Sequence, residues 1–464
     1  MNAQPEKLQT GRLREDSVFK LLMQFSFPAI MAMLVLALYN MVDRIFIGNY
    51  PPTGSNGLAA IAVSFPFLLV LLAFGLLIGV GGATLYSLRM GERRHEEAER
   101  TLGNASFAAL VIACIYVAVT WIFMKPLLHL CGADSSVMPY AVDYMKIIIP
   151  FSFFQFQAFV YNNMMRADGS PTIAMAVMLA GAVTNIVLDP VFIFGFGWGM
   201  EGAAWATIIG QVLTAVLGFA YFRSTRCTHK LQLKKMFPHP AILKRIALLG
   251  TPQFFLQLAG GAALLVLNTM LLKYGKESEY GSTIPISAMG IVMSVQSLMV
   301  MPVQGITQGA QPIIGYNFGA RLIRRVKKTV LLAAAAATVW SILSFVMTTF
   351  FPEPMIRLFT QEAPLIRFGS KALRIVFITI PIVGFQIVIS NYFQAVGKPM
   401  KAVFLTLSRQ ILVLIPAIIC FGALWGVEGI LWAFPFSEII AATLSAVAIA
   451  FEWRRLDRFE KTRL

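Results

Sequence analysis

Charged residues are scarce in this chain of 464 residues. Asp, Glu, Lys and Arg together make up 13% of it, hydrophobic residues make up 58%, and the mean hydropathy is +0.73. A soluble protein of this size could not keep so much apolar surface away from water, whereas a protein that crosses a membrane many times has no such constraint. The long apolar runs also lack strict alternation, which argues against a transmembrane β-barrel. The scarcity of charge therefore indicates an all-α polytopic membrane protein.

Cysteine and histidine are equally rare, with four of each. Their spacing matches neither a disulfide framework nor a metal site. The chain also lacks a His-Glu-x-x-His motif, an acidic cluster with Mg²⁺-binding spacing and a credible Ser/His pair. We therefore expect no enzymatic activity and no cofactor. A membrane-embedded enzyme is the least favoured alternative.

Acidic residues number 22 against 38 basic ones, which gives a formal net charge of +16. Such a balance can indicate nucleic-acid binding, but its distribution does not. If the N-terminus is cytoplasmic, 28 of the 38 Lys and Arg residues fall in cytoplasmic segments. This is the positive-inside bias of membrane proteins, so we expect both termini in the cytoplasm and no nucleic-acid partner. The first apolar run is too long for a cleavable signal peptide.

Apolar windows of about 19 residues predict twelve transmembrane helices. The predicted spans begin near positions 20, 57, 101, 138, 171, 201, 246, 284, 329, 365, 400 and 428. Several approach 30 residues, more than the roughly 20 that a bilayer requires, so we expect tilted or kinked helices.

An internal repeat divides the chain into two halves. The segment Asn163-Met-Met-Arg-Ala-Asp-Gly-Ser-Pro171 matches Asn391-Tyr-Phe-Gln-Ala-Val-Gly-Lys-Pro399 at an offset of 228, and Gly-x-Glu-Gly recurs at 199–202 and 426–429. Because each repeat holds six spans, the halves have the same orientation and are related by a pseudo-two-fold axis along the membrane normal. We predict an N-terminal lobe at 1–225, a basic cytoplasmic linker at 226–245 and a C-terminal lobe at 246–464.

Two carboxylates, Asp43 and Asp189, lie within apolar spans of the first half only. A charged Asp at the centre of a span costs roughly 2.5–3.5 kcal/mol, so it needs a partner or a function. Asn185 shares a helical face with Asp189, Pro190 should bend that helix, and Thr207 lies on the next span. Such oxygens can hold a proton or Na⁺.

The corresponding positions in the second half are apolar, which separates these acids from residues that serve the fold. They are Met270 or Leu271 opposite Asp43, and Ile415 opposite Asp189. A structural alternative pairs Asp43 with the adjacent Arg44. Consecutive helical residues diverge by about 100°, so this pair would face poorly, and the role of Arg44 stays open.

Other intramembrane polar residues have structural interpretations. Glu201 and Glu428 occur in both repeats, where each begins a helix and complements its dipole. Arg409 and Glu438 lie at depths of roughly 14 and 18 Å on antiparallel neighbours, so we expect a structural ion pair.

Neutral polar residues on the helices are mainly expected to form interhelical hydrogen bonds. A minority could line a substrate cavity, together with methionines, which repack easily around varied compounds. The candidates are Gln157, Met293 and Gln296.

The blocks Asn40-Met-Val-Asp-Arg-Ile-Phe-Ile-Gly48, Asn162 to Pro171 and Asn185-Ile-Val-Leu-Asp-Pro190 resemble those of the MATE (multidrug and toxic compound extrusion) transporters, over essentially the whole chain. The resemblance is to the bacterial branch that couples through the N-terminal lobe. It implies efflux of small organic, drug-like compounds in exchange for H⁺ or Na⁺, by a monomer in lipid of the bacterial inner membrane.

The same resemblance implies which residues couple transport to the ion. They are Asp43, Asn185, Asp189 and Thr207, with Asn162 and Tyr39 nearby. A lipid-linked oligosaccharide flippase of the same superfamily is the alternative. Such a flippase should carry cationic residues in its central cavity, and Arg409 is the one intramembrane residue that suggests this.

Overall fold

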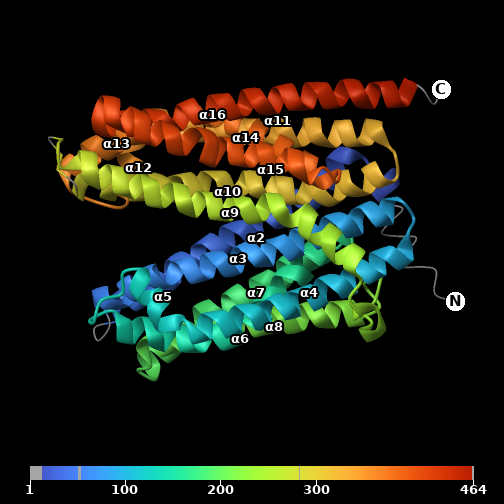
Figure 1. Ribbon diagram of the computed structural model, residues 1–464, viewed down its shortest axis with the longest axis horizontal. Coiled ribbons are helices and arrows are strands. Elements are labelled where there is room, and N and C mark those ends of the chain that lie inside the picture. The colour runs from blue at the N-terminus through green and yellow to red at the C-terminus, as the bar shows by residue number, and fades with distance from the viewer. Residues whose placement is uncertain (1–12, 51–53, 279, 282, 462–464) are drawn as a thin grey trace.

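The structure is a computed structural model that describes residues 13–50, 54–278, 280–281 and 283–461, all helices and connecting segments with no β-strand among them (Figure 1). The helices form two bundles. The first contains α2 (Val18–Asn49), α3 (Gly54–Gly91), α4 (His95–Ile122), α5 (Met124–Leu130), α6 (Met138–Ala167), α7 (Pro171–Pro190), the π-helical turn η1 (Val191–Gly195) and α8 (Gly199–Arg223). The second contains α9 (Pro240–Gly275), α10 (Thr283–Gly319), α11 (Ile323–Phe350), α12 (Pro352–Arg357), α13 (Ala363–Phe377), α14 (Ile380–Ala395), α15 (Pro399–Leu407), the π-helical turn η3 (Ser408–Leu414) and α16 (Ile415–Lys461).

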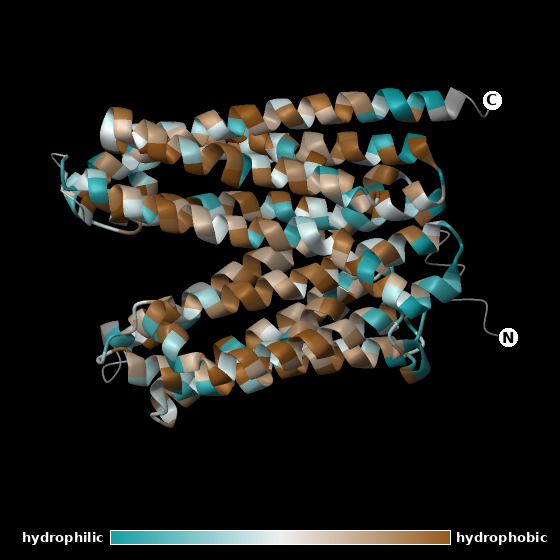
Figure 2. Ribbon diagram, in the orientation of Figure 1, coloured by the Kyte–Doolittle hydropathy of each residue, from teal (hydrophilic) through white to brown (hydrophobic). Residues whose placement is uncertain are grey.

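The predicted twelve spans are confirmed, six in each bundle. Among the described residues, nine helical segments are each long and apolar enough to cross a membrane. The segment Pro399–Arg458 contains two crossings, because the chain reverses at Gly426 (φ 62°, ψ −141°). The pair α13 and α14 forms one crossing with a 49° bend. The less apolar helix α6 adds the twelfth, and Figure 2 shows the apolar band that these helices share.

The connection between the bundles is shorter than the predicted linker at 226–245. Helix α8 ends at Arg223 and α9 begins at Pro240, with a short 3₁₀ turn, η2 (Leu233–Met236), between them. Proline suits the first turn of a helix because it has no N–H to leave unpaired there. The helix therefore begins before the apolar run that marks the span.

The two bundles converge at the end of the molecule that carries both termini and diverge toward the other end (Figure 1). At the convergent end α3 packs against α9 and α10, and α2 packs against α10. Glycines permit this approach: a Cβ on Gly81 would lie 2.1 Å from the Ile246 carbonyl oxygen, and one on Gly250 would lie 1.8 Å from that of Leu77. Only residues without a side chain allow such backbone contact.

The hydrophobic cores follow the same division. One core of the first bundle continues into the second at the convergent end, where it includes Ile246, Leu249 and Ile313. Toward the other end each bundle has a core of its own, centred on residues such as Ile148 in the first and Phe377 in the second. The packing therefore makes the bundles two lobes that are joined at one end.

Candidate functional site

Three neighbouring helices of the N-terminal lobe carry most of the predicted ion-coupling residues. Helix α2 carries Asp43, α7 carries Asn185 and Asp189, and α8 carries Thr207. Helices α2 and α8 both pack against α7. Pro190 follows Asp189 and has no N–H to donate to the helix. The wider π-helical turn η1 begins directly after it.

The amide of Asn185 links the helices α7 and α8. Its Nδ2 lies 3.3 Å from Asp189 Oδ1 and 3.4 Å from Thr207 Oγ1. Asn185 and Asp189 are 2% and 0% exposed, so both are shielded from lipid and water. Their spacing of four residues puts both side chains on one helical face, as predicted.

Asp43 approaches this pair from α2. Its side chain is 9% exposed, and it lies within electrostatic range of Asp189. Tyr39, one turn earlier on α2, lies within range of both carboxylates. The end of α2 is fixed to the segment between η1 and α8, because Tyr50 Oη donates to the Gly197 carbonyl at 3.0 Å. The side chain of Arg44, the alternative partner of Asp43, lies outside the described residues.

Tyr144 of α6 also belongs to the cluster, although the sequence analysis did not select it. It is 4% exposed, lies beside the side chain of Thr207 and is within electrostatic range of Asp43 and Asp189. A comparison of residue depths along the antiparallel helices α6 and α7 could have identified Tyr144 from the sequence. Tyr144 is two turns from the start of α6, and Asp189 is at the end of α7, so both lie at a similar depth.

Asn162 does not join this cluster. Its Nδ2 donates to the Ala174 carbonyl at 2.9 Å, which places it beside the first turn of α7. Ala174 precedes Asp189 by fifteen residues, or about 22 Å along a helix. The resemblance grouped Asn162 with the site, but α6 is antiparallel to α7 and brings Tyr144 to that depth instead.

The cluster presents oxygen atoms that can bind a cation. Among the described residues, Asp189 Oδ2 and Asn185 Oδ1 are buried and accept no hydrogen bond. Two carboxylates, an amide and two hydroxyls are hard ligands of the kind that Na⁺ takes, and a carboxylate pair can equally hold one proton. The donor set therefore fits a monovalent cation.

The three candidate cavity residues differ in their surroundings. Gln157 is 6% exposed and donates through Nε2 to the Ser106 carbonyl of α4 at 2.9 Å, so its amide serves an interhelical contact inside the lobe. Met293 and Gln296 are half-buried on α10, which faces the first lobe in Figure 1. Met293 also packs against the core of the second lobe, and a substrate role for these residues stays a prediction.

Arg409 and Glu438 form the expected ion pair inside the second lobe. Arg409 Nη1 donates to Glu438 Oε1 at 3.2 Å, and the side chains are 17% and 11% exposed. Each charge thereby gains the partner that an apolar surrounding requires.

The repeated glutamates Glu201 and Glu428 each pair with a lysine. Lys146 Nζ lies 2.6 Å from Glu201 Oε1, and Lys371 pairs with Glu428 at the equivalent place in the second lobe. An ion pair present in both lobes agrees with a structural role for the glutamates.

The family match to known proteins falls in two segments, one in each lobe. The MatE family model matches residues 28–191 and 277–419. The multidrug export protein MepA of Staphylococcus haemolyticus is 27% identical over 450 residues, 97% of each chain. The MATE multidrug transporter DinF-BH, solved in complex with a ligand, is 37% identical, covers 95% of this chain and 97% of that chain, and superposes with a TM-score of 0.88. An outward-facing multidrug resistance MATE family transporter is 25% identical, covers 97% and 99%, and has a TM-score of 0.87.

Proposed function

Because this chain belongs to the MatE family of multi-pass membrane transporters, we propose that it is a multidrug efflux transporter, which exports amphipathic or cationic organic compounds in exchange for H⁺ or Na⁺. Similar proteins are described as multidrug export proteins and multidrug transporters, and one of them was solved with a ligand bound. The two-lobed fold that these proteins share suits alternating access.

One observation supports the proposed coupling: four polar residues lie together in the interior of one lobe, namely Asp43, Asn185, Asp189 and Thr207. The residues at the positions of Asp43 and Asp189 in the other lobe are apolar. A cation that enters this cluster neutralises at least one carboxylate. The change in charge alters the packing of α2 on α7, and Pro28 gives α2 a point at which it can bend. Coupling requires only that cation and drug favour opposite states of one conformational equilibrium.

We infer the orientation from the basic segments 89–100 and 223–245, which lie at the hydrophilic, convergent end of the molecule (Figure 2). Under the positive-inside bias this end and both termini lie in the cytoplasm. The lobes then diverge toward the outside, which is the arrangement that releases an exported compound. We place the protein as a monomer in a bacterial inner membrane, surrounded by lipid.

A flippase is less well supported. Arg409 was the cation that could have held a lipid diphosphate, but Glu438 neutralises it. A cation compensated by a carboxylate inside one lobe is a poor anion site, because binding would have to break the pair.

Efflux of a fluorescent organic cation tests the proposal. Cells that express wild type, Asp43→Asn or Asp189→Asn are compared with and without Na⁺ and with an uncoupler. We expect both substitutions to reduce efflux at least about tenfold. The amide of Asn carries no charge, so the binding of a cation can no longer neutralise a carboxylate at that position. Glu353→Gln is the matched control, since this exposed acid pairs with Arg357, one turn away on the short helix α12.

Dependence on Na⁺ identifies Na⁺ as the coupling ion, whereas collapse by the uncoupler without a Na⁺ requirement identifies H⁺. Wild-type efflux in both Asp variants would remove the coupling assignment while leaving the fold untouched.

A further inference from the structure

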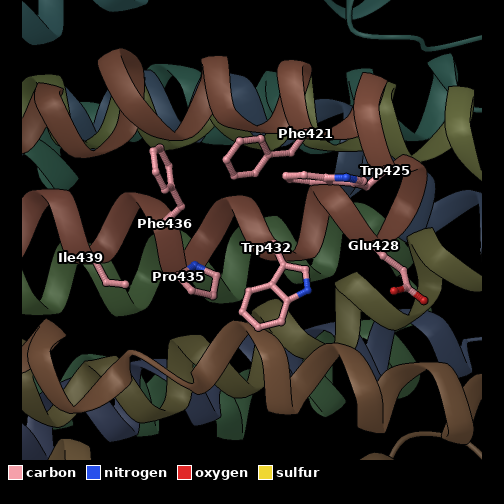
Figure 3. A pocket seen from close by; sticks show the side chains of 7 residues that line it. All are labelled: Phe421, Trp425, Glu428, Trp432, Pro435, Phe436 and Ile439. Atoms are coloured by element: carbon pink, nitrogen blue, oxygen red, sulfur yellow. The ribbon is translucent and has the colours of Figure 1, made fainter.

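Residues from both arms of α16 line a groove (Figure 3). The two arms meet at the end of the molecule away from the termini (Figure 1). The volume of the groove is about 730 Å³. The residues that line it are Phe421, Trp425, Glu428, Trp432, Pro435, Phe436 and Ile439. Several of these rings are exposed, including Trp425 at 61% and Trp432 at 45%. The lining is thus apolar and aromatic along its length, with one charged residue.

An ion pair forms one end of this groove. Glu428 lines it and pairs with Lys371 of α13. The lysine and glutamate side chains remain 46% and 55% exposed, so each charge can take a second partner. The carboxylate uses Oε1 for the lysine, which leaves Oε2 for another donor. The groove therefore joins a long apolar surface to a fixed pair of opposite charges.

The first lobe carries the same charged pair and tryptophans, with different aromatic neighbours. Lys146, Glu201, Trp198 and Trp205 occupy the positions of Lys371, Glu428, Trp425 and Trp432 in the repeat. Here Phe192 and Phe196 lie with their ring centroids 5.3 and 5.2 Å from Trp198. Trp205 packs on Phe151 at 5.5 Å, whereas its counterpart Trp432 lines the open groove. The two lobes thus offer the same charged pair beside different sets of aromatic rings.

Tryptophan is enriched where a membrane protein meets the lipid–water boundary, because its ring is apolar and its N–H is polar. Trp425 and Trp432 lie beside the chain reversal that ends a span, next to an exposed ion pair. The groove at this level opens toward the headgroups, and its deeper part, at Phe436 and Ile439, runs toward the acyl chains.

We propose that this groove binds one zwitterionic glycerophospholipid from the leaflet remote from the termini. The ammonium of the headgroup lies at Glu428, the phosphate lies at Lys371, and an acyl chain occupies the surface of Trp432, Phe436 and Ile439. Charge complementarity selects this lipid class: an anionic headgroup such as glycerol phosphate satisfies only the lysine and is repelled by Glu428. The inference needs only that the chain spans a membrane and does not rest on the exported compound.

Native mass spectrometry of the purified full-length protein tests it, after incubation with equal amounts of phosphatidylethanolamine and phosphatidylglycerol. We expect wild type to retain one lipid, with phosphatidylethanolamine preferred roughly tenfold. Glu428→Gln should abolish this preference. Ile439→Trp, which fills the groove and leaves the ion pair intact, should abolish retention of both lipids. The matched controls Glu201→Gln and Lys146→Met should behave as wild type.

Equal retention of the two lipids by wild type would overturn the proposal, as would undiminished retention by Ile439→Trp. Loss of the preference in Glu201→Gln would show that the ion pairs act on lipid generally and not through this groove. Retention of an added amphipathic organic cation in place of lipid would also count against it. Because none of these measurements depends on transport, an inactive antiporter would leave the result readable.

Discussion

Arg325 of the second lobe holds the main chain of Asp16, which leads into the first helix of the first lobe: its Nη2 donates to the Asp16 carbonyl at 2.7 Å. The same nitrogen donates to the Leu13 carbonyl at 3.1 Å. In a second attachment the first lobe holds the segment that leads into the second lobe. Asn104 Oδ1 of α4 accepts a hydrogen bond from His239 N, just before α9, at 2.7 Å. Each lobe thus fastens the segment that enters the other lobe, and both attachments lie at the convergent end.

Arg325→Ala should release the first attachment and favour opening at the convergent end. Loss of charge-assisted hydrogen bonds is worth roughly 1.5–3 kcal/mol, so the open population should rise about tenfold or more. Spin labels at the exposed positions Arg94 and Lys328 report the distance between the lobes. Lys327→Ala is the control, because its ion pair with Asp457 lies within the second lobe. An unchanged distance distribution in Arg325→Ala would show that the attachment does not hold the lobes together.

Thr207→Val should weaken the cation site without unfolding the lobe. The substitution keeps the shape and removes the hydroxyl that faces Asn185 at 3.4 Å. A lost hydrogen bond of about 1 kcal/mol predicts a roughly fivefold rise in the ion concentration for half-maximal efflux. Thr214→Val is the matched control on α8, because Thr214 Oγ1 donates to the Gly210 carbonyl of its own helix. Equal effects of the two variants would place Thr207 outside the site.

Arg409→Met should strongly destabilise the second lobe by leaving Glu438 uncompensated. Breaking one side of a buried pair costs about 3–5 kcal/mol, whereas replacing both sides is often neutral. The double variant Arg409→Met/Glu438→Met should therefore recover most of the loss. Unfolding of the purified protein measures both, and a double variant no more stable than the single one would argue for a role beyond mutual compensation.

Asp168, in the segment between α6 and α7, should make stability depend on pH. Burial raises the pKa of its carboxyl above the ordinary 3.8, although hydrogen bonds from Tyr221, Tyr86 and the Thr228 main chain oppose this. The folded state then holds the proton at pH values where the unfolded chain has lost it. Stability from this group is complete below the unfolded pKa and declines as the pH rises through the folded pKa.

The neutral variant Asp168→Asn should flatten this decline, and the unfolding temperature between about pH 4 and pH 8 measures it. Tyr221→Phe removes one opposing hydrogen bond and should steepen the decline. Parallel pH curves for wild type and Asp168→Asn would contradict the assignment.

The sequence predicted most of the fold because membrane spans are set by local composition. Twelve apolar windows and the repeat gave the number of helices and their division, since backbone groups in lipid must be satisfied within a helix. The details that escaped are tertiary. One is the 49° bend between α13 and α14, and another is the start of α9 at Pro240, before its apolar run.

The candidate site divides in the same way. Asp43 and Asp189 were predictable, because a carboxylate in an apolar span is costly enough to indicate a function. Asn162 and Tyr144 were not. Which residues of two antiparallel helices meet depends on their relative shift along the axis, and the structure places Ala174 beside Asn162 and Thr207 beside Tyr144.

By itself the sequence determined that this chain spans a membrane twelve times in two like halves, with Asp43 and Asp189 in the first half opposite apolar residues of the second. The physical reason is that transfer of a helix into lipid depends on its own residues. Only the tertiary structure decided which oxygens converge, where the lobes are fastened and which aromatic residues of α16 line one groove. Those features arise from contacts between segments far apart in the chain, which no local pattern specifies.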